Sequence, residues 1–236
     1  MKRWNRRTVL ISTVAAASAA TTGAGIWLLA GRSRAKGLLR PPGALDEEAF
    51  LASCIKCGQC IQVCPYHSLK LLDLAAGIDM GTPAVDARQR GCYLCDLFPC
   101  ILCCPSGALD AEVREIKQVQ MGIAVLHDPQ RCWAVDDKPV TEKWLAELKS
   151  HGNETDLEQT FNAKLMKSVN KPCRLCEEVC PIPKRETAIA IQNGVPVIGR
   201  GCVGCGACVE VCPEGIFEIA ARKKFDDVYK NQGGRS

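Results

Sequence analysis

The chain has 236 residues with 17 Cys, and its aromatic residues are few, at 5 Phe, 4 Trp and 3 Tyr. This composition disfavours collagen-like, coiled-coil, disordered and multi-span membrane proteins, and it favours a fold stabilised by metal or by disulfides. The net charge of +4 does not indicate a nucleic-acid partner, because the first 35 residues carry 6 basic and no acidic side chains. The remaining chain is slightly acidic, so we expect a partner with a basic docking face.

Residues 1–35 have the pattern of a twin-arginine export signal. The pair Arg6-Arg7 precedes an uncharged stretch over residues 9–30, and small residues near Ala35 suit cleavage after that residue. We therefore predict a protein that is exported to the periplasm. The alternative is a retained membrane anchor, because the uncharged stretch is long enough to span a bilayer.

Two segments are expected to follow the signal. Residues 36–131 should hold the first two cysteine motifs, with a short helix that begins near Asp46 and a strand over residues 121–127. Residues 132–187 should hold the third motif together with two helices over residues 133–172. These helices either cover the third metal site or dock a partner.

The last part of the chain carries the clearest local signal. Residues 188–221 should begin with a β-hairpin, because Asn193-Gly194 lies between two apolar runs and suits a type I′ turn. The fourth motif follows the hairpin, and residues 222–236 form a tail. The predicted fold class is α+β, with two dicluster ferredoxin-like units in tandem and a helical insertion between motifs.

Four groups of cysteines share the spacing of bacterial ferredoxins, and each group ends just before a proline. The first reads C-x2-C-x2-C-x3-C-P, and the fourth repeats it. The second has two extra residues, and the third has only the tail of the pattern, so its first ligand is assigned to Cys132. The predicted ligands are Cys54, Cys57, Cys60, Cys64, Cys92, Cys95, Cys100, Cys104, Cys132, Cys173, Cys176, Cys180, Cys202, Cys205, Cys208 and Cys212.

Sixteen ligands are enough for four [4Fe–4S] clusters. Three closely spaced cysteines can wrap one cluster, while the fourth points to the other cluster of a pair. An odd cysteine count and a regular spacing argue against disulfides, and zinc sites do not need the full pattern. The seventeenth cysteine, Cys103, is expected to be a buried spare thiol, because Cys104 has both the spacing and the proline.

No catalytic residue is predicted. His67, His127 and His151 have no metal or triad spacing, and no glycine-rich phosphate loop follows a predicted strand. The protein is therefore expected not to be an enzyme by itself.

The residues around the motifs resemble the NapG/MauM family of ferredoxin-type proteins. The matching stretches are Leu39 to Ala44, Glu48 to Phe50, Cys57 to Cys60, Pro105 to Asp110 and Met121-Gly122. The resemblance covers about residues 37–219 and departs from the family in the long gap before Cys173.

The family implies an electron-transfer subunit of a quinol dehydrogenase that is associated with the periplasmic face of the inner membrane. Its expected partners are a membrane-bound, quinol-oxidising protein of the NapH type and a periplasmic c-type cytochrome or reductase, such as nitrate reductase. Two alternatives stay open: an electron-transfer subunit of another molybdoenzyme, and a MauM-like maturation or electron-transfer factor for methylamine dehydrogenase. A zinc-bound interaction module is the alternative from another class.

The resemblance to four-cluster molybdoenzyme subunits also implies how the motifs pair. The first motif should pair with the fourth, and the second with the third, in a nested arrangement. The four expected ligand sets are Cys54, Cys57, Cys60 with Cys212; Cys202, Cys205, Cys208 with Cys64; Cys92, Cys95, Cys100 with Cys180; and Cys132, Cys173, Cys176 with Cys104.

Overall fold

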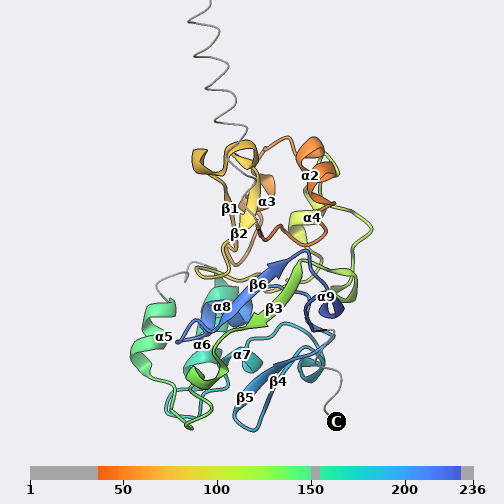
Figure 1. The fold of residues 1–236 in the computed structure, drawn as a ribbon. Helices are drawn as coiled ribbons and strands as arrows, with labels where there is room; N and C mark the ends of the chain where they lie inside the picture. The colour runs from red at the N-terminus through yellow and green to blue at the C-terminus, as the bar shows by residue number, and fades with distance from the viewer. Residues whose placement is uncertain (1–36, 150–154, 230–236) are drawn as a thin grey trace, which may run out of the picture. The chain divides into compact units, whose positions relative to one another are not determined.

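The computed structural model describes residues 37–149 and 155–229 (Figure 1). The predicted export signal over residues 1–35, His151 and the last part of the predicted tail lie outside the described residues. The helices are α2 (Glu47–Ser53), α3 (Gln59–Gln62), α4 (Pro99–Leu102), α5 (Glu142–Lys149), α6 (Asp156–Met166), α7 (Leu175–Glu178), α8 (Ala207–Val211) and α9 (Phe225–Tyr229). The shorter 3₁₀ turns are η1 (Leu74–Asp79), η2 (Ile116–Gln118), η3 (Pro129–Arg131) and η4 (Arg185–Thr187).

Six short strands form three antiparallel ribbons of two strands each in this part of the chain. They are β1 (Leu69–Leu71) with β2 (Pro83–Val85), β4 (Ile189–Gln192) with β5 (Val195–Ile198), and β3 (Gly122–Leu126) with β6 (Phe217–Ala221). The first two ribbons join neighbours in sequence. The third pairs Gly122 with Ala221, so it ties the end of the second motif region to the strand after the fourth motif.

The hairpin of β4 and β5 forms where the sequence predicts it. Asn193 and Gly194 have φ angles of 51° and 76°, which are the positive values that a type I′ turn requires. The predicted strand is also present as β3, and α2 begins after Asp46, whose side chain accepts a hydrogen bond from the Ala49 amide. Local residue patterns are therefore enough to place these elements.

Two helices, α5 and α6, lie within residues 133–172, and both pack onto the cysteine motifs. Trp144 of α5 donates a hydrogen bond from Nε1 to the Val211 carbonyl at 3.1 Å. The ring of Phe161 in α6 packs at a tilt against Tyr93 with centroids 4.4 Å apart, and Tyr93 packs in the same way against Tyr66 at 4.8 Å. The helices thus cover the first, second and fourth motifs and not only the third.

Residues 72–81 fall in a different compact unit from residues 37–71 and 82–229. Within this unit Asp73 caps the turn η1 by accepting a hydrogen bond from the Ala75 amide, and the Gly81 amide donates to the Leu72 carbonyl at 2.8 Å. Across the described ranges, no helix has the length and apolar content that crossing a membrane requires.

Candidate metal centres

We number each set of thiols by the motif that supplies its first three cysteines. The first and third sets each line a small cavity. One cavity brings Cys104 of the second motif to the three cysteines that open the first motif. The other brings Cys132 and Cys212 to the third motif. The two sets are Cys54, Cys57, Cys60 and Cys104, and Cys132, Cys173, Cys176 and Cys212.

In the other two sets as well, the fourth cysteine comes from the neighbouring motif. Cys180 lines a small cavity with Cys202, Cys205 and Cys208. Burial and the nearby charge of Cys64 together raise the pKa of the Cys95 thiol to about 11. The same two causes, together with the charge of Cys95, raise the pKa of Cys100. Cys64 therefore lies with the second motif.

The nested pairing expected from the sequence is wrong. Cys64 lies beside the second motif and Cys212 beside the third, so the motifs pair in sequence, first with second and third with fourth. The reason is local packing: α3 packs against α4, and α7 against α8, which places each fourth cysteine opposite its neighbour's loop. Two motifs with equal cysteine spacing have loops of similar shape, but the spacing does not determine which motif each of them pairs with.

The two pairs meet through the second and fourth sets. The Cys92 amide donates a hydrogen bond to the Cys205 carbonyl at 2.8 Å. Gly91 approaches so closely that an added Cβ would lie 2.5 Å from the Ala207 nitrogen. The order of the sets in space is therefore first, second, fourth and third.

The motif loops share an unusual backbone conformation. The residue before the second cysteine of a motif has a positive φ in three motifs: 58° at Lys56, 47° at Leu94 and 70° at Gly204. Such angles turn the loop back on itself, and they are strained for residues with a side chain. At Gly204 a Cβ would also lie 2.3 Å from the Gly122 carbonyl carbon, so only glycine fits.

Backbone amides point at the sulfurs. The backbone groups of Leu94, Leu175 and Ala207 act to lower the pKa of Cys92, Cys173 and Cys205, which offsets part of the larger rise caused by burial. The Ser68 amide donates to Cys64 Sγ at 3.3 Å. Amide donors stabilise thiolate charge and help to set the potential of a bound cluster.

Burial disfavours the ionised form of many of these thiols. Burial raises the pKa of Cys60 to about 12, and the charges of Cys103 and Cys54 add to the shift. Burial likewise raises the pKa of Cys173 to about 11. A metal centre reverses this preference because its positive charge compensates four thiolates. The cavities, amides and thiols together fit [4Fe–4S] clusters.

Within residues 37–149 and 155–229, no group of three or more His, Cys, Asp or Glu side chains is placed to hold one ion. His67 and His127 lie at the surface beside carboxylates, with His67 Nδ1 3.1 Å from Glu158 and His127 Nε2 3.2 Å from Glu218.

Cys103 lines the first cavity beside Cys104. It is half-buried and not fully buried as expected, and its Sγ lies 3.4 Å from the Cys100 carbonyl. Cys104 Sγ lies 3.7 Å from Ser106 Oγ, and amides of Leu109 and Ser106 are among its neighbours. The assignment of Cys104 as the ligand stays a prediction.

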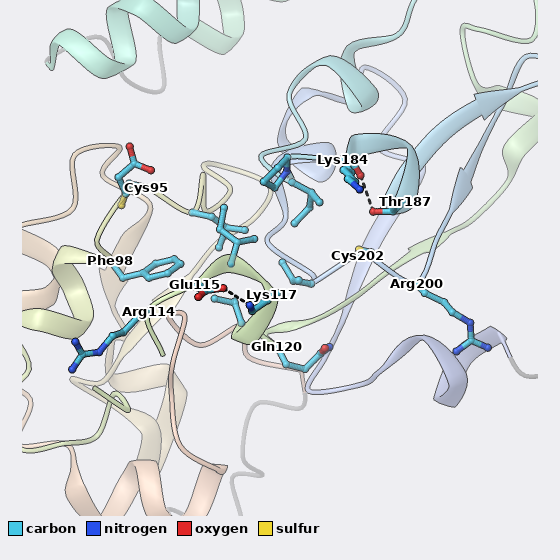
Figure 2. Close-up of a pocket in the computed structure, with 18 of the residues that line it drawn as sticks. Cys95, Phe98, Arg114, Glu115, Lys117, Gln120, Lys184, Thr187, Arg200 and Cys202 are labelled. Atoms are coloured by element: carbon cyan, nitrogen blue, oxygen red, sulfur yellow. Dashed lines mark hydrogen bonds and ion pairs between the residues drawn. The ribbon is translucent and has the colours of Figure 1, made fainter. Parts of the chain in front are cut away.

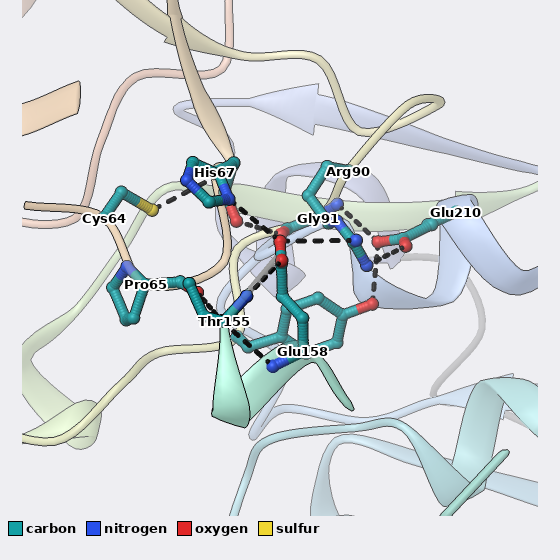
Figure 3. Close-up of polar contacts among 10 residues, drawn as sticks. Cys64, Pro65, His67, Arg90, Gly91, Thr155, Glu158 and Glu210 are labelled. Carbon is teal, nitrogen blue, oxygen red and sulfur yellow. Dashed lines mark hydrogen bonds and ion pairs between the residues drawn. The ribbon is translucent and has the colours of Figure 1, made fainter. Parts of the chain in front are cut away.

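Sequence reasoning missed a buried charged cluster between the motifs, shown in Figure 3. Glu210 of α8 accepts hydrogen bonds from Arg90 Nη1 at 3.0 Å, from the Gly91 amide at 2.7 Å and from the Tyr93 hydroxyl at 2.7 Å. Arg90 and Glu210 are 4% and 3% exposed. This cluster joins the second motif to the fourth. Its two charges occur together because either one would be costly to bury without the other.

A second carboxylate extends the cluster to α6. Glu158 is fully buried, and its Oε1 lies 3.5 Å from Arg90 Nη2. Its Oε2 accepts from the Thr155 amide, and Thr155 Oγ1 donates to the Pro65 carbonyl at 2.7 Å. Helix α6 is therefore held against the residues that follow Cys64.

Comparison with known proteins agrees with this geometry. A family model described as a 4Fe-4S dicluster domain matches residues 53–108, and a 4Fe-4S binding domain matches residues 197–218. The dicluster match spans the first two motifs, in line with their pairing in sequence.

Several curated proteins are similar over most of the chain. The ferredoxin-type protein NapG of Escherichia coli K12 is 34% identical over 206 residues, which cover 82% of this chain and 74% of NapG. The methylamine utilization ferredoxin-type protein MauM of Methylorubrum extorquens is 32% identical over 220 residues, with 88% and 84% covered. The ferredoxin-type protein NapF of E. coli K12 is 27% identical over 190 residues, with 79% and 87% covered. No solved structure matches the chain significantly.

Proposed function

Because the chain belongs to the NapG and MauM family of ferredoxin-type proteins, we propose that its four thiol sets each hold a [4Fe–4S] cluster. The protein is an iron–sulfur electron-transfer protein of the ferredoxin type. In our proposal it takes single electrons from a membrane-bound, quinol-oxidising partner of the NapH type. It passes them to a periplasmic c-type cytochrome or reductase, such as nitrate reductase.

The observation that carries the proposal is the exchange of fourth cysteines within two sequential pairs. In each pair, one motif lends its last cysteine to the other, as in dicluster ferredoxins. The hydrogen bond from Cys92 to Cys205 supports a continuous path between the pairs. Clusters so placed supply one-electron chemistry that the side chains alone do not have.

The chain's own residues would bind the clusters and tune them. The thiols provide the bonds, the amides beside the sulfurs stabilise negative charge, and the apolar surroundings exclude water. The two pairs of motifs form two modules, the first with motifs one and two and the second with motifs three and four. The buried pair of Arg90 and Glu210 would hold these modules in fixed register. Fixed distances matter because electron transfer between centres weakens steeply as their separation grows.

A second candidate is supported by the similarity to MauM, which is almost as high as that to NapG and covers more of the chain. In that case the protein serves methylamine utilization, as an electron-transfer or maturation factor for methylamine dehydrogenase. Either role would place the protein at the periplasmic face of the membrane after export through the predicted signal.

Metal analysis tests the cluster assignment directly. Anaerobically purified protein should contain about 16 iron and about 16 sulfide, which is four clusters by ligand count. The clusters should be reduced by a quinol only when membranes carrying the NapH-type partner are present. Stoichiometric zinc without sulfide would exclude the iron–sulfur assignment, and clusters that no quinol system reduces would leave the maturation role as the better account.

A further inference from the structure

A large groove lies at the junction of the two cluster modules, as Figure 2 shows. Its volume is about 740 Å³, which is within the usual range for ligand sites. Cys95 and Cys202 both line it, and they belong to the second and fourth thiol sets. The groove is therefore lined by predicted ligands of both sets that meet where the two modules join.

The floor of the groove is apolar. Leu94, Phe98 and Val119 line it from the first module, and Ile182 and Val203 line it from the second. All five side chains are buried. A groove with such a floor can accept an apolar contact at its centre while its rim stays in water.

The rim carries more positive than negative charge. Arg114, Lys117, Lys184 and Arg200 line it against two carboxylates, Asp96 and Glu115. Lys117 pairs with Glu115 at 2.6 Å, and Arg200 pairs with Asp226 at 2.8 Å.

Two of the rim cations are available to a partner. Arg114 and Lys184 are both exposed, and neither makes an ion pair with any residue that the structure describes. Lys184 lies just before η4 in the second module, whereas Arg114 lies after the second motif in the first module. The uncompensated charge thus lies on both sides of the junction.

We propose that this groove is the docking site of a soluble redox protein whose contact surface is acidic around an apolar centre. The inference rests on the proposed function and adds the place and the charge of one partner. It reverses, for this surface, the basic partner expected from the net charge of the chain, because docking responds to the local potential. In the transfer, one electron leaves the protein and reduces a ferric haem to ferrous, and no bond forms or breaks.

The test uses the complete cluster-loaded protein and two soluble monohaem c-type cytochromes as probes, one with an acidic and one with a basic haem face. Stopped-flow absorbance gives the rate constant for electron transfer from the reduced protein. The groove variant is Arg114→Glu with Lys184→Glu. The matched control is Lys143→Glu with Lys171→Glu, which makes the same change in net charge at exposed lysines outside the groove.

The wild-type protein should reduce the acidic cytochrome faster than the basic one, and this rate should fall as salt is added. The groove variant should slow the reaction with the acidic cytochrome about tenfold, whereas the control should change it by less than about twofold. Equal iron content in all three proteins shows that the variants are folded. The salt dependence is measured on the wild-type protein alone, so this part of the test does not depend on whether the variants fold.

Equal slowing in the two variants, or a wild-type preference for the basic cytochrome, would overturn the docking proposal and leave the proposed function standing. If the wild-type protein holds its clusters but reduces neither cytochrome, the proposed function is contradicted, and the docking site falls with it.

Discussion

At the scale of single residues, the sequence predicts the metal ligands far better than the groups that support them. The cysteines are recognisable because their spacing repeats before prolines. Glu158 and Glu210 carry no such mark, since a charged residue on a short helix is normally expected at the surface. Their burial depends on Arg90, which is distant from both in sequence. The left-handed backbone at Lys56 and Leu94 is equally hidden, whereas the matching Gly204 could have indicated it.

Glu210→Ala should destabilise the protein strongly, because it would leave the Arg90 charge buried without its closest partner. The expected loss is about 3–5 kcal/mol. Glu218→Ala is the matched control, since Glu218 pairs with His127 at an exposed site and should cost less than about 1 kcal/mol. Anaerobic urea denaturation, followed by cluster absorbance, measures both. Similar midpoints for the two variants would show that the buried cluster contributes little.

At the scale of elements, local patterns succeed and long-range contacts do not. The hairpin of β4 and β5 follows from Asn193-Gly194, and α2 follows from its cap at Asp46. Strand β3 is predictable from its apolar run, but its partner β6 is not, because no local signal links two segments so far apart. The same limit applies to α5 and α6, whose positions on the motifs depend on Trp144 and Phe161.

The hairpin turn offers a test of how tightly β4 and β5 are held. At Gly194, a Cβ would lie 3.0 Å from the Ala134 carbonyl oxygen, close to Cys132 in the chain. Gly194→Ala should therefore cost about 2–3 kcal/mol, by adding this contact to the strain of a positive φ. Gly107→Ala is the control: its φ of 70° is similar, but a Cβ there meets nothing within 4 Å. It should cost about 1 kcal/mol. Equal losses in urea denaturation would mean that the turn has room to adjust.

At the scale of the whole molecule, sequence spacing gives the number of ligands but not their distribution. The two compact motifs look alike, yet each pairs with an irregular neighbour, because packing of α3 on α4 and of α7 on α8 decides the partner. The order first, second, fourth and third therefore had to come from the structure.

Export is also a property of the whole chain. Replacing Arg6 and Arg7 by Lys should leave the protein in the cytoplasm, because the arginine pair is read by a receptor and not as charge alone. Cell fractionation with an antibody measures this. The control replaces Lys2 by Arg and Arg3 by Lys, and it should be exported normally. Periplasmic accumulation of the first variant would point to another export route.

The exchange of Cys64 and Cys104 has a consequence for repair after oxidation. If each set holds a cluster, every cluster is anchored partly by the loop of its neighbour. Oxygen that destroys one cluster also releases a tether of the next, so damage should spread to both members of a module before it crosses to the other. The protein would then lose and regain its clusters two at a time. Repair would therefore act on a whole module and not on a single cluster.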